Sequence, residues 1–275
     1  MANTYDFYKP KLDSEYPEVD GPASITTYIT ALDNAYSRFR EKTARRYRCT
    51  TGLGISNGEK GSSSNGSNGA EKKEDDPKSI FSLDSVDYPV FHSPYGKLVQ
   101  KGHARLLYND FLSKPTLPKF ANIPDAEALL NIAPQAALTD KALEKTFIAL
   151  AGAQHKAAVM PSMHCAKRCG NMYTASLYGG LASLISAIPP SELRGKRISM
   201  FAYGSGCASS FYTIRVKGDT TEIREKMDLL NRLATMKVVP CQEYVDALKV
   251  RLFTLPPFLH FNAPSCFPRV LFNSC

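Results

Sequence analysis

The chain has 275 residues, 43% of them hydrophobic and 22% charged, which is enough for a buried core and ordinary for a globular protein. The formal net charge of +8 suits an anionic partner, either a phosphate-bearing small molecule or a nucleic acid. The first ten residues, MANTYDFYKP, resemble no secretory signal, no apolar run is long enough to span a bilayer, and the seven cysteines show no disulfide-like spacing, so we expect a cytoplasmic protein with reduced thiols.

The first predicted element is a helix that follows a turn at residues 20–22 and is capped by Ser24. Apolar residues then recur at spacings of three and four, which gives the helix one apolar face: Ile25, Tyr28, Ile29, Leu32, Tyr36 and Phe39. Its end carries the basic run RFREKTARRYR. We interpret this run as a solvated face, because positive charge is favoured near a helix C-terminus, and we expect no nucleic-acid partner.

A low-complexity segment interrupts the chain at residues 51–80. Residues 51–70 contain 14 Gly, Ser or Asn in 20, and the charged stretch EKKEDDPK follows. Such a sequence buries too little apolar surface to offset the entropy of ordering, so we predict a flexible insertion inside a domain.

The second half of the chain predicts alternating strands and helices. The sequence FSLDSVDYPVFH predicts a strand near a sheet edge, because Pro89 removes a ladder hydrogen bond. Leu98, Val99, Leu106, Leu107 and Phe111 would form the inner face of a helix at 97–111, and Leu143, Phe147 and Leu150 that of a helix at 139–152. Further elements are expected as a helix from about 171, a strand at 196–206, a strand at 209–218 and a helix at 221–236. This order favours an α/β layered fold.

His92 is the first candidate for chemistry, because it stands where a strand ends and a Ser-Pro-x-Gly turn begins, a place where α/β folds position their sites. Lys97 and Lys101 follow on one helix face at i and i+4, and two ammonium groups there repel each other unless an anion lies between them. The pair suits a phosphate group, and a merely solvated face is the alternative.

The stretch CGNMYTASLYGG is the second candidate. Asn171 lies just before or at a helix start, where its amide caps the helix or faces a ligand. Cys165 and Cys169 form C-x₃-C beside His164, but no second pair with zinc-ligand spacing exists elsewhere, so we expect no metal site.

The stretch AYGSGCASS is the third candidate. Gly204 and Gly206 flank Ser205 between two strands, which differs from a Gly-x-Ser-x-Gly nucleophile elbow leading into a helix. Its backbone N–H groups could form a nest for an oxyanion or a carboxylate, and a simple glycine-rich hairpin bend is the alternative.

Together these stretches resemble the C-terminal region of the eukaryotic hydroxymethylglutaryl-CoA synthases. The resemblance runs from YDFYKPKLDSEYPEVDG and SITTYITALDNAY through FHSPYGKLVQKGHARLLYNDF and CGNMYTASLYGGLASLIS to GKRISMFAYGSGCASSFY. It implies the C-terminal half of a thiolase-like layered α/β fold over residues 1–250, broken by the disordered insertion at 51–80. Residues 251–275 depart from the family as a proline-rich tail that we expect not to be helical.

The resemblance also implies an activity, the condensation of acetyl-CoA with acetoacetyl-CoA on the route to isoprenoids and sterols, with the CoA thioesters as substrates and no cofactor. His92 matches the family's catalytic histidine, and Lys97 and Lys101 match its CoA-binding lysines. Asn171 and Ser205 match positions that bind the acyl group, and Tyr203 beside Ser205 is expected to shape the same pocket.

The family's nucleophilic cysteine and general-base glutamate lie upstream of the point where this sequence begins. Cys49, Cys165, Cys169 and Cys207 do not stand in the nucleophile motif, and free cysteines are often inert core residues. We therefore expect the isolated chain to be inactive. The alternatives are a CoA-thioester-binding fragment, or a half-subunit that pairs with an N-terminal half or with a second copy of itself. A Cys-His-Asn hydrolase is disfavoured, because nothing in the sequence places a cysteine beside His92.

Overall fold

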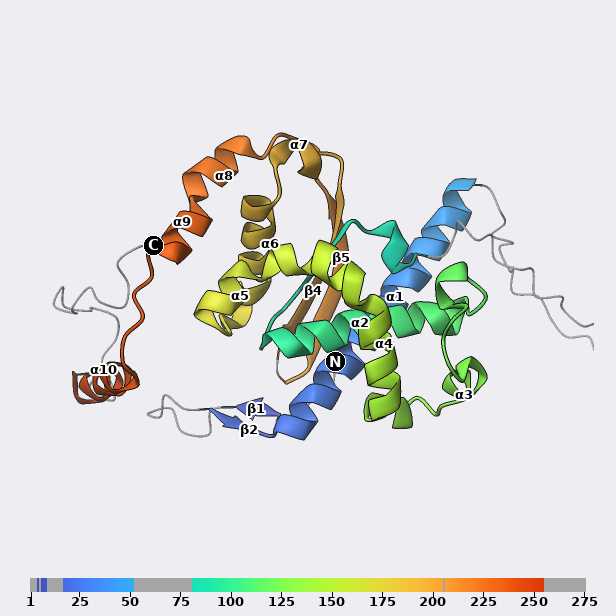
Figure 1. The fold of residues 1–275 in the computed structure, drawn as a ribbon, viewed down its shortest axis with the longest axis horizontal. Coiled ribbons are helices and arrows are strands. Elements are labelled where there is room, and N and C mark those ends of the chain that lie inside the picture. Colours follow the sequence, from blue (N-terminus) through green and yellow to red (C-terminus); the bar gives the residue numbers. More distant parts are fainter. Residues whose placement is uncertain (1–3, 5, 9–16, 52–80, 205, 255–275) are drawn as a thin grey trace, which may run out of the picture.

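The structure is a computed structural model that describes residues 4, 6–8, 17–51, 81–204 and 206–254. A three-stranded sheet in the order β3-β4-β5 forms its centre, with β3 parallel to β4 and β4 antiparallel to β5. Helices cover both faces of this sheet, so the layers run helix, sheet, helix (Figure 1). The strands are β1 (Phe7–Tyr8), β2 (Glu18–Val19), β3 (Tyr88–Phe91), β4 (Arg197–Gly204) and β5 (Ala208–Arg215).

The helices occupy most of the remaining described chain. They are α1 (Gly21–Thr51), α2 (Gly96–Ser113), α3 (Ala126–Leu130), α4 (Lys141–Gln154), α5 (His164–Cys169), α6 (Ser176–Ala187), α7 (Pro190–Leu193), α8 (Thr221–Met227), α9 (Leu229–Ala234) and α10 (Cys241–Thr254). None of them, within the described ranges, has the length and apolar character needed to cross a bilayer.

Alternation along β4 divides the core between the two faces of the sheet. Phe201 points to one face, where it packs with Phe211 of β5 and with the apolar stripes of α1, α2 and α4. Ile198 and Met200 point to the other face, where they pack with α6. Successive residues of a strand point to opposite sides, so the alternation at 196–206 positions both cores.

The close approach of α6 to β3 depends on a glycine. A Cβ atom added at Gly180 would lie 2.9 Å from Cγ1 of Val90 and 3.5 Å from the carbonyl oxygen of Ser162. Gly180, the second glycine of SLYGGLAS, thus lets α6 pack closely against β3, at the end of which His92 lies.

Several predicted elements are confirmed. The apolar stripe of α1 is buried or half-buried, β3 is an edge strand, the predicted inner face of α2 is buried, and β4 and β5 form the predicted strand pair. In α4, Leu143 and Phe147 are buried as predicted, but Leu150 is 39% exposed, so its inward placement is wrong.

Other boundaries differ for local reasons. The cap of α1 is Asp20 rather than Ser24, because the Asp20 carboxylate accepts a hydrogen bond from the N–H of Ala23 (3.0 Å). The helix expected from about 171 starts only at Ser176, after a 3-10 turn at Tyr173–Ala175. The helix expected at 221–236 is two helices, since Asp228 adopts a left-handed conformation with φ of 41° between them.

The two atypical segments fall largely outside the described residues. Residues 52–80 of the predicted insertion and residues 255–275 of the tail are among those not described. The α10 helix continues to Thr254, so the first four residues of the tail are helical, contrary to expectation. The prolines of the tail begin only at Pro256, so none of them interrupts these four residues.

Candidate active site

His92 is the first residue after β3, and its backbone is held from two sides. Its N–H donates to the carbonyl of Phe201 in β4 (2.8 Å), and its carbonyl accepts from the hydroxyl of Tyr28 in α1 (2.9 Å). Tyr28 is fully buried, and its ring packs edge-on against Phe201 at 5.3 Å. The helix and the neighbouring strand therefore fix the position from which the imidazole projects.

The His92 side chain is 7% exposed. Burial lowers its pKa from 6.5 to about 4, because the charged imidazolium loses its hydration there. The imidazole is consequently neutral near pH 7, with one nitrogen able to donate a hydrogen bond and the other able to accept one.

Tyr203 lies beside His92, with ring centroids 6.0 Å apart. Its hydroxyl donates to a carboxylate oxygen of Asp6 (3.1 Å), and its ring packs against Tyr28 at 5.2 Å. Asp6 is fully buried, and its other carboxylate oxygen has no partner among the described residues. The N-terminal segment thus reaches the end of β4 and holds Tyr203 next to the imidazole.

The same segment reaches the turn that carries Asn171. Phe7, the neighbour of Asp6, packs edge-on against Tyr173 with ring centroids 5.9 Å apart. The Asn171 side-chain oxygen accepts from the N–H of Tyr173 (2.9 Å) and from the hydroxyl of Ser176 (3.2 Å). This amide therefore organises the turn before α6, and its NH₂ group has no hydrogen bond to a described residue.

The two lysines have different surroundings. Lys97 is exposed in the first turn of α2 and forms no ion pair with a described residue. Lys101, one turn later, pairs with Glu144 of α4 at 3.0 Å, and its side chain is 12% exposed. The repulsion expected between the two ammonium groups is therefore relieved by a carboxylate of the protein, and Lys97 is the one that faces solvent.

The hairpin between β4 and β5 is the third part of the predicted site. Ser205 lies outside the described residues. On either side of it, Gly204 pairs with Ala208, Gly206 has φ of 89°, and Cys207 has φ of 68°. A non-glycine residue is uncommon in the left-handed region, so Cys207 marks a tightly constrained turn.

The described cysteines are free thiols. Cys165 is buried, Cys207 is half-buried, and Cys49, Cys169 and Cys241 are exposed. Among the residues that the structure describes, no group of three or more His, Cys, Asp or Glu side chains is arranged to hold a metal ion.

Comparison with known proteins shows the family of the chain. The family described as hydroxymethylglutaryl-coenzyme A synthase C terminal matches residues 1–57 and 63–255. The chain belongs to the hydroxymethylglutaryl-CoA synthase family. It is 59% identical over 251 residues to the hydroxymethylglutaryl-CoA synthase of Ganoderma lucidum, covering 91% of this chain and 48% of that protein. It is 48% identical over 253 residues to that of Mycosarcoma maydis, covering 91% of this chain and 50% of that protein.

Solved structures place the fold in the same family. MvaS in complex with 3-hydroxy-3-methylglutaryl coenzyme A superposes with a TM-score of 0.61 at 30% identity, over 93% of this chain and 49% of that one. The thiolase-like layered fold predicted from the sequence is therefore confirmed. The chain spans about half the length of the curated relatives that it matches.

Two members of the site escaped prediction from the sequence. Asp6 stands in the YDFYKP stretch that supports the family resemblance, but nothing local links it to Tyr203, which lies 197 positions away. Tyr28 was predicted only as part of an apolar helix face, and its hydroxyl turns out to anchor the His92 backbone.

Proposed function

We propose that this chain provides the acetoacetyl-CoA-binding side of a hydroxymethylglutaryl-CoA synthase, which condenses acetyl-CoA with acetoacetyl-CoA. The observation that carries the proposal is a buried imidazole at the end of β3, beside Tyr203, in a chain of this family. As the acetyl carbanion attacks the ketone of acetoacetyl-CoA, negative charge develops on the ketone oxygen. A fixed hydrogen-bond donor in a water-poor site stabilises such charge.

In this proposal, neutral His92 donates a hydrogen bond to that oxygen, which then takes up a proton from water to become the tertiary hydroxyl of the product. Asp6 and Tyr203 act as positioning residues, since their hydrogen bond restrains the ring that lies beside the imidazole. Asn171 presents its NH₂ group to the acyl chain. Ser205, two residues after Tyr203 in the sequence, binds the same acyl group, and no metal or other cofactor takes part.

Lys97 is the residue that we propose to bind the CoA phosphates directly. Its side chain is exposed at the start of α2, where unpaired backbone N–H groups also favour an anion. Lys101 would contribute only after exchanging its Glu144 partner for phosphate, so its part in binding is expected to be smaller.

A complementary N-terminal half is part of the proposal, whether it belongs to the same polypeptide or to another. The acyl-accepting cysteine and the general-base glutamate of the reaction would come from that half, and residues 1–275 alone would bind thioesters without turning them over. Exposed aromatic side chains near the Asn171 turn support a protein contact there, because Tyr173 is 56% exposed and Tyr178 65%. A second copy of this chain is the other candidate for that surface.

Calorimetric titration of the 275-residue chain with CoA and with acetoacetyl-CoA tests the binding. His92→Phe should weaken the binding of acetoacetyl-CoA more than the binding of CoA, because the imidazole contacts only the acyl end of the thioester. Lys97→Glu should weaken the binding of both ligands by about tenfold, as expected for loss of a charged contact. Lys217→Glu, which makes the same charge change just after β5 at the opposite end of the sheet, is the matched control. Equal losses in all three variants would contradict the assignment.

Mass spectrometry after incubation with acetyl-CoA separates binding from catalysis. The chain alone should show no covalent acetylation. Acetylation of Cys207 or another cysteine would show that the chain contains its own nucleophile, and the proposed division of labour would then be wrong. Mixing the chain with the part of the Ganoderma lucidum enzyme that lies outside the match should restore release of CoA if the two halves assemble.

A further inference from the structure

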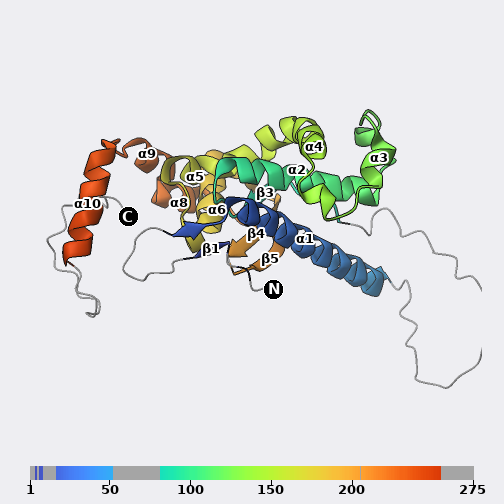
Figure 2. The same ribbon diagram turned by 90° about the horizontal axis from the view of Figure 1, so that it is seen from below.

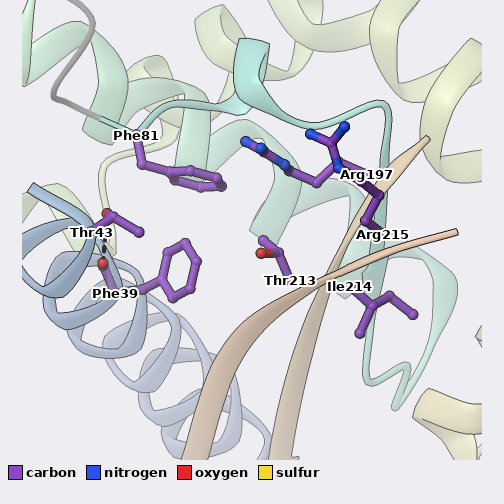
Figure 3. A pocket seen from close by; sticks show the side chains of 7 residues that line it. All are labelled: Phe39, Thr43, Phe81, Arg197, Thr213, Ile214 and Arg215. Carbon is purple, nitrogen blue, oxygen red and sulfur yellow. Dashed lines mark hydrogen bonds between the residues drawn. The ribbon is translucent and has the colours of Figure 1, made fainter. Parts of the chain in front are cut away.

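A cavity of about 290 Å³ lies between the second half of α1 and the strands β4 and β5 (Figure 3). The C-terminal part of α1 extends beyond the sheet (Figure 2). Its lining residues are Phe39, Thr43, Phe81, Arg197, Thr213, Ile214 and Arg215.

The cavity contains two arginines that stand directly opposite each other. Arg197 of β4 pairs with Arg215 of β5 in the antiparallel ladder, and both point to the α1 side of the sheet. Side chains opposite each other in such a ladder have Cβ atoms only about 5 Å apart, and like charges there are destabilising. Arg215 is exposed, so water screens part of this repulsion, and an anion between the two guanidinium groups would remove the rest.

No carboxylate in the described part of the chain forms an ion pair with either guanidinium. Arg197 donates to the carbonyl oxygen of Ser85 (3.3 Å), which is a neutral acceptor. The nearby Asp87 carboxylate is already bonded to the ammonium of Lys196 (2.9 Å) and to the backbone N–H of Arg197 (2.8 Å). The Arg215 guanidinium has no hydrogen-bond acceptor and no ion-pair partner among the described residues.

The opposite wall of the cavity is apolar. The rings of Phe39 and Phe81 meet edge to face with centroids 4.8 Å apart, and Figure 3 shows them facing the arginine side chains. The hydroxyl of Thr43 is turned to its own helix, where it donates to the carbonyl of Phe39 (2.8 Å). The hydroxyl of Thr213 has no bond to a described residue and lies between the aromatic and the basic walls (Figure 3).

This cavity is separate from the candidate active site. Arg197 is the first residue of β4 and Tyr203 the seventh, so at about 3.3 Å per residue the two lie about 20 Å apart along the strand. A ligand here would not overlap a thioester held at His92.

We propose that the cavity binds a small organic anion, with a carboxylate or phosphate group between Arg197 and Arg215 and a flat apolar body against Phe39 and Phe81. Arginine favours both oxyanions because its planar fork donates two parallel hydrogen bonds. Thr213 supplies a further donor to the same group. The volume is near the lower limit for small-molecule sites, which restricts the body to about one ring.

The proposal is tested by NMR titration of the 275-residue chain with phenyl phosphate, benzoate, inorganic phosphate and benzyl alcohol. The two aryl anions should bind more tightly than inorganic phosphate, and neutral benzyl alcohol should not bind. Signals of Phe39, Phe81 and Thr213 should shift, while His92 and Tyr203 should not. Whichever of phenyl phosphate and benzoate binds more tightly shows whether the site prefers a phosphate or a carboxylate group.

Two variants separate a specific site from general basic charge. Arg215→Gln should weaken the binding of the aryl anion by about tenfold, which is the effect of losing a charge-assisted contact. The variant should remain folded, because Arg215 is exposed. Arg194→Gln removes an exposed arginine outside the cavity and should have no effect. Equal binding by both variants, or no shift with either aryl anion, would overturn the proposal. Thr213→Val provides a second, smaller expected loss, so a poorly folded Arg215→Gln protein would not leave the proposal undecided.

Discussion

Replacement of Arg105 by Met should destabilise the chain strongly, because Arg105 joins α2 to α1 and to the 3-10 turn at Ala136–Leu138. Its Nε and Nη2 donate to the carboxylate of Asp33 in α1 at 2.8–3.1 Å, and its Nη1 donates to the carbonyl of Ala137 at 2.8 Å. The side chain is 9% exposed, and its guanidinium also lies 5.0 Å from the ring centroid of Tyr108. This contact clamps α1, which anchors His92 through Tyr28, to α2, which carries Lys97.

The expected cost follows from what Arg105→Met leaves behind. Breaking a buried ion pair by removing one partner costs about 3–5 kcal/mol, because the other charge stays in a poorly hydrated place. Asp33 is 22% exposed and keeps a hydrogen bond from the Asn109 side-chain amide (2.7 Å), so water and this amide relieve part of its charge, while the Ala137 carbonyl loses its donor. The result is a loss of about 3 kcal/mol, or about 6–12 °C in Tm for a chain of this size.

Urea unfolding of the wild type, Arg105→Met, Asp33→Leu and the double variant measures this cost. If the stranded carboxylate causes most of the loss, the double variant should be more stable than the sum of the single losses by about 2 kcal/mol. A single loss below about 1 kcal/mol would place the pair among surface ion pairs. Strict additivity would show that the charge on Asp33 is not the cause.

Three further outcomes follow from the structure. His103→Leu should raise stability by about 1 kcal/mol, because both imidazole nitrogens are buried without a described partner. Burial lowers the His103 pKa from 6.5 to about 3, so the wild type should lose stability as pH falls from 6.5 towards 3, and the variant should lose less in urea titrations at each pH. Gly180→Ala should cost about 1–3 kcal/mol in the same assay, because its methyl group meets Val90, and a neutral result would contradict the close packing. Lys101→Gln should lower Tm more than Lys97→Gln, since of these two lysines only Lys101 forms an ion pair with a described residue, Glu144. A larger loss of Tm in Lys97→Gln would contradict this assignment.

Periodicity in the sequence predicted the elements whose buried face is continuous. The stripe in α1 and the alternation in β4 each satisfy one period over many residues, so the core could be assigned without the structure. Boundaries failed where a single side chain decided them. Asp20 competes with Ser24 for the cap of α1, and Asp228 interrupts a stretch that is otherwise compatible with one helix.

The candidate site was predicted in part for a similar reason. His92 and Tyr203 were recognisable because each stands in a long stretch that resembles the family, and the structure brings their rings together. The contacts of Lys101 with Glu144 and of Tyr203 with Asp6 join residues far apart in the chain. No local spacing encodes such contacts, so the unequal surroundings of the two lysines could be found only in three dimensions.

The imidazole signals of the 275-residue chain during titration with acetoacetyl-CoA give the most direct test of the proposed function. Four of the chain's five histidines lie in the described part of the chain, and of these four only His92 packs beside Tyr203. The account predicts that the His92 signal shifts with added ligand and saturates, while the signals of His103 and His155 stay constant. A saturating titration that leaves His92 unchanged, or that shifts His164 instead, would contradict it.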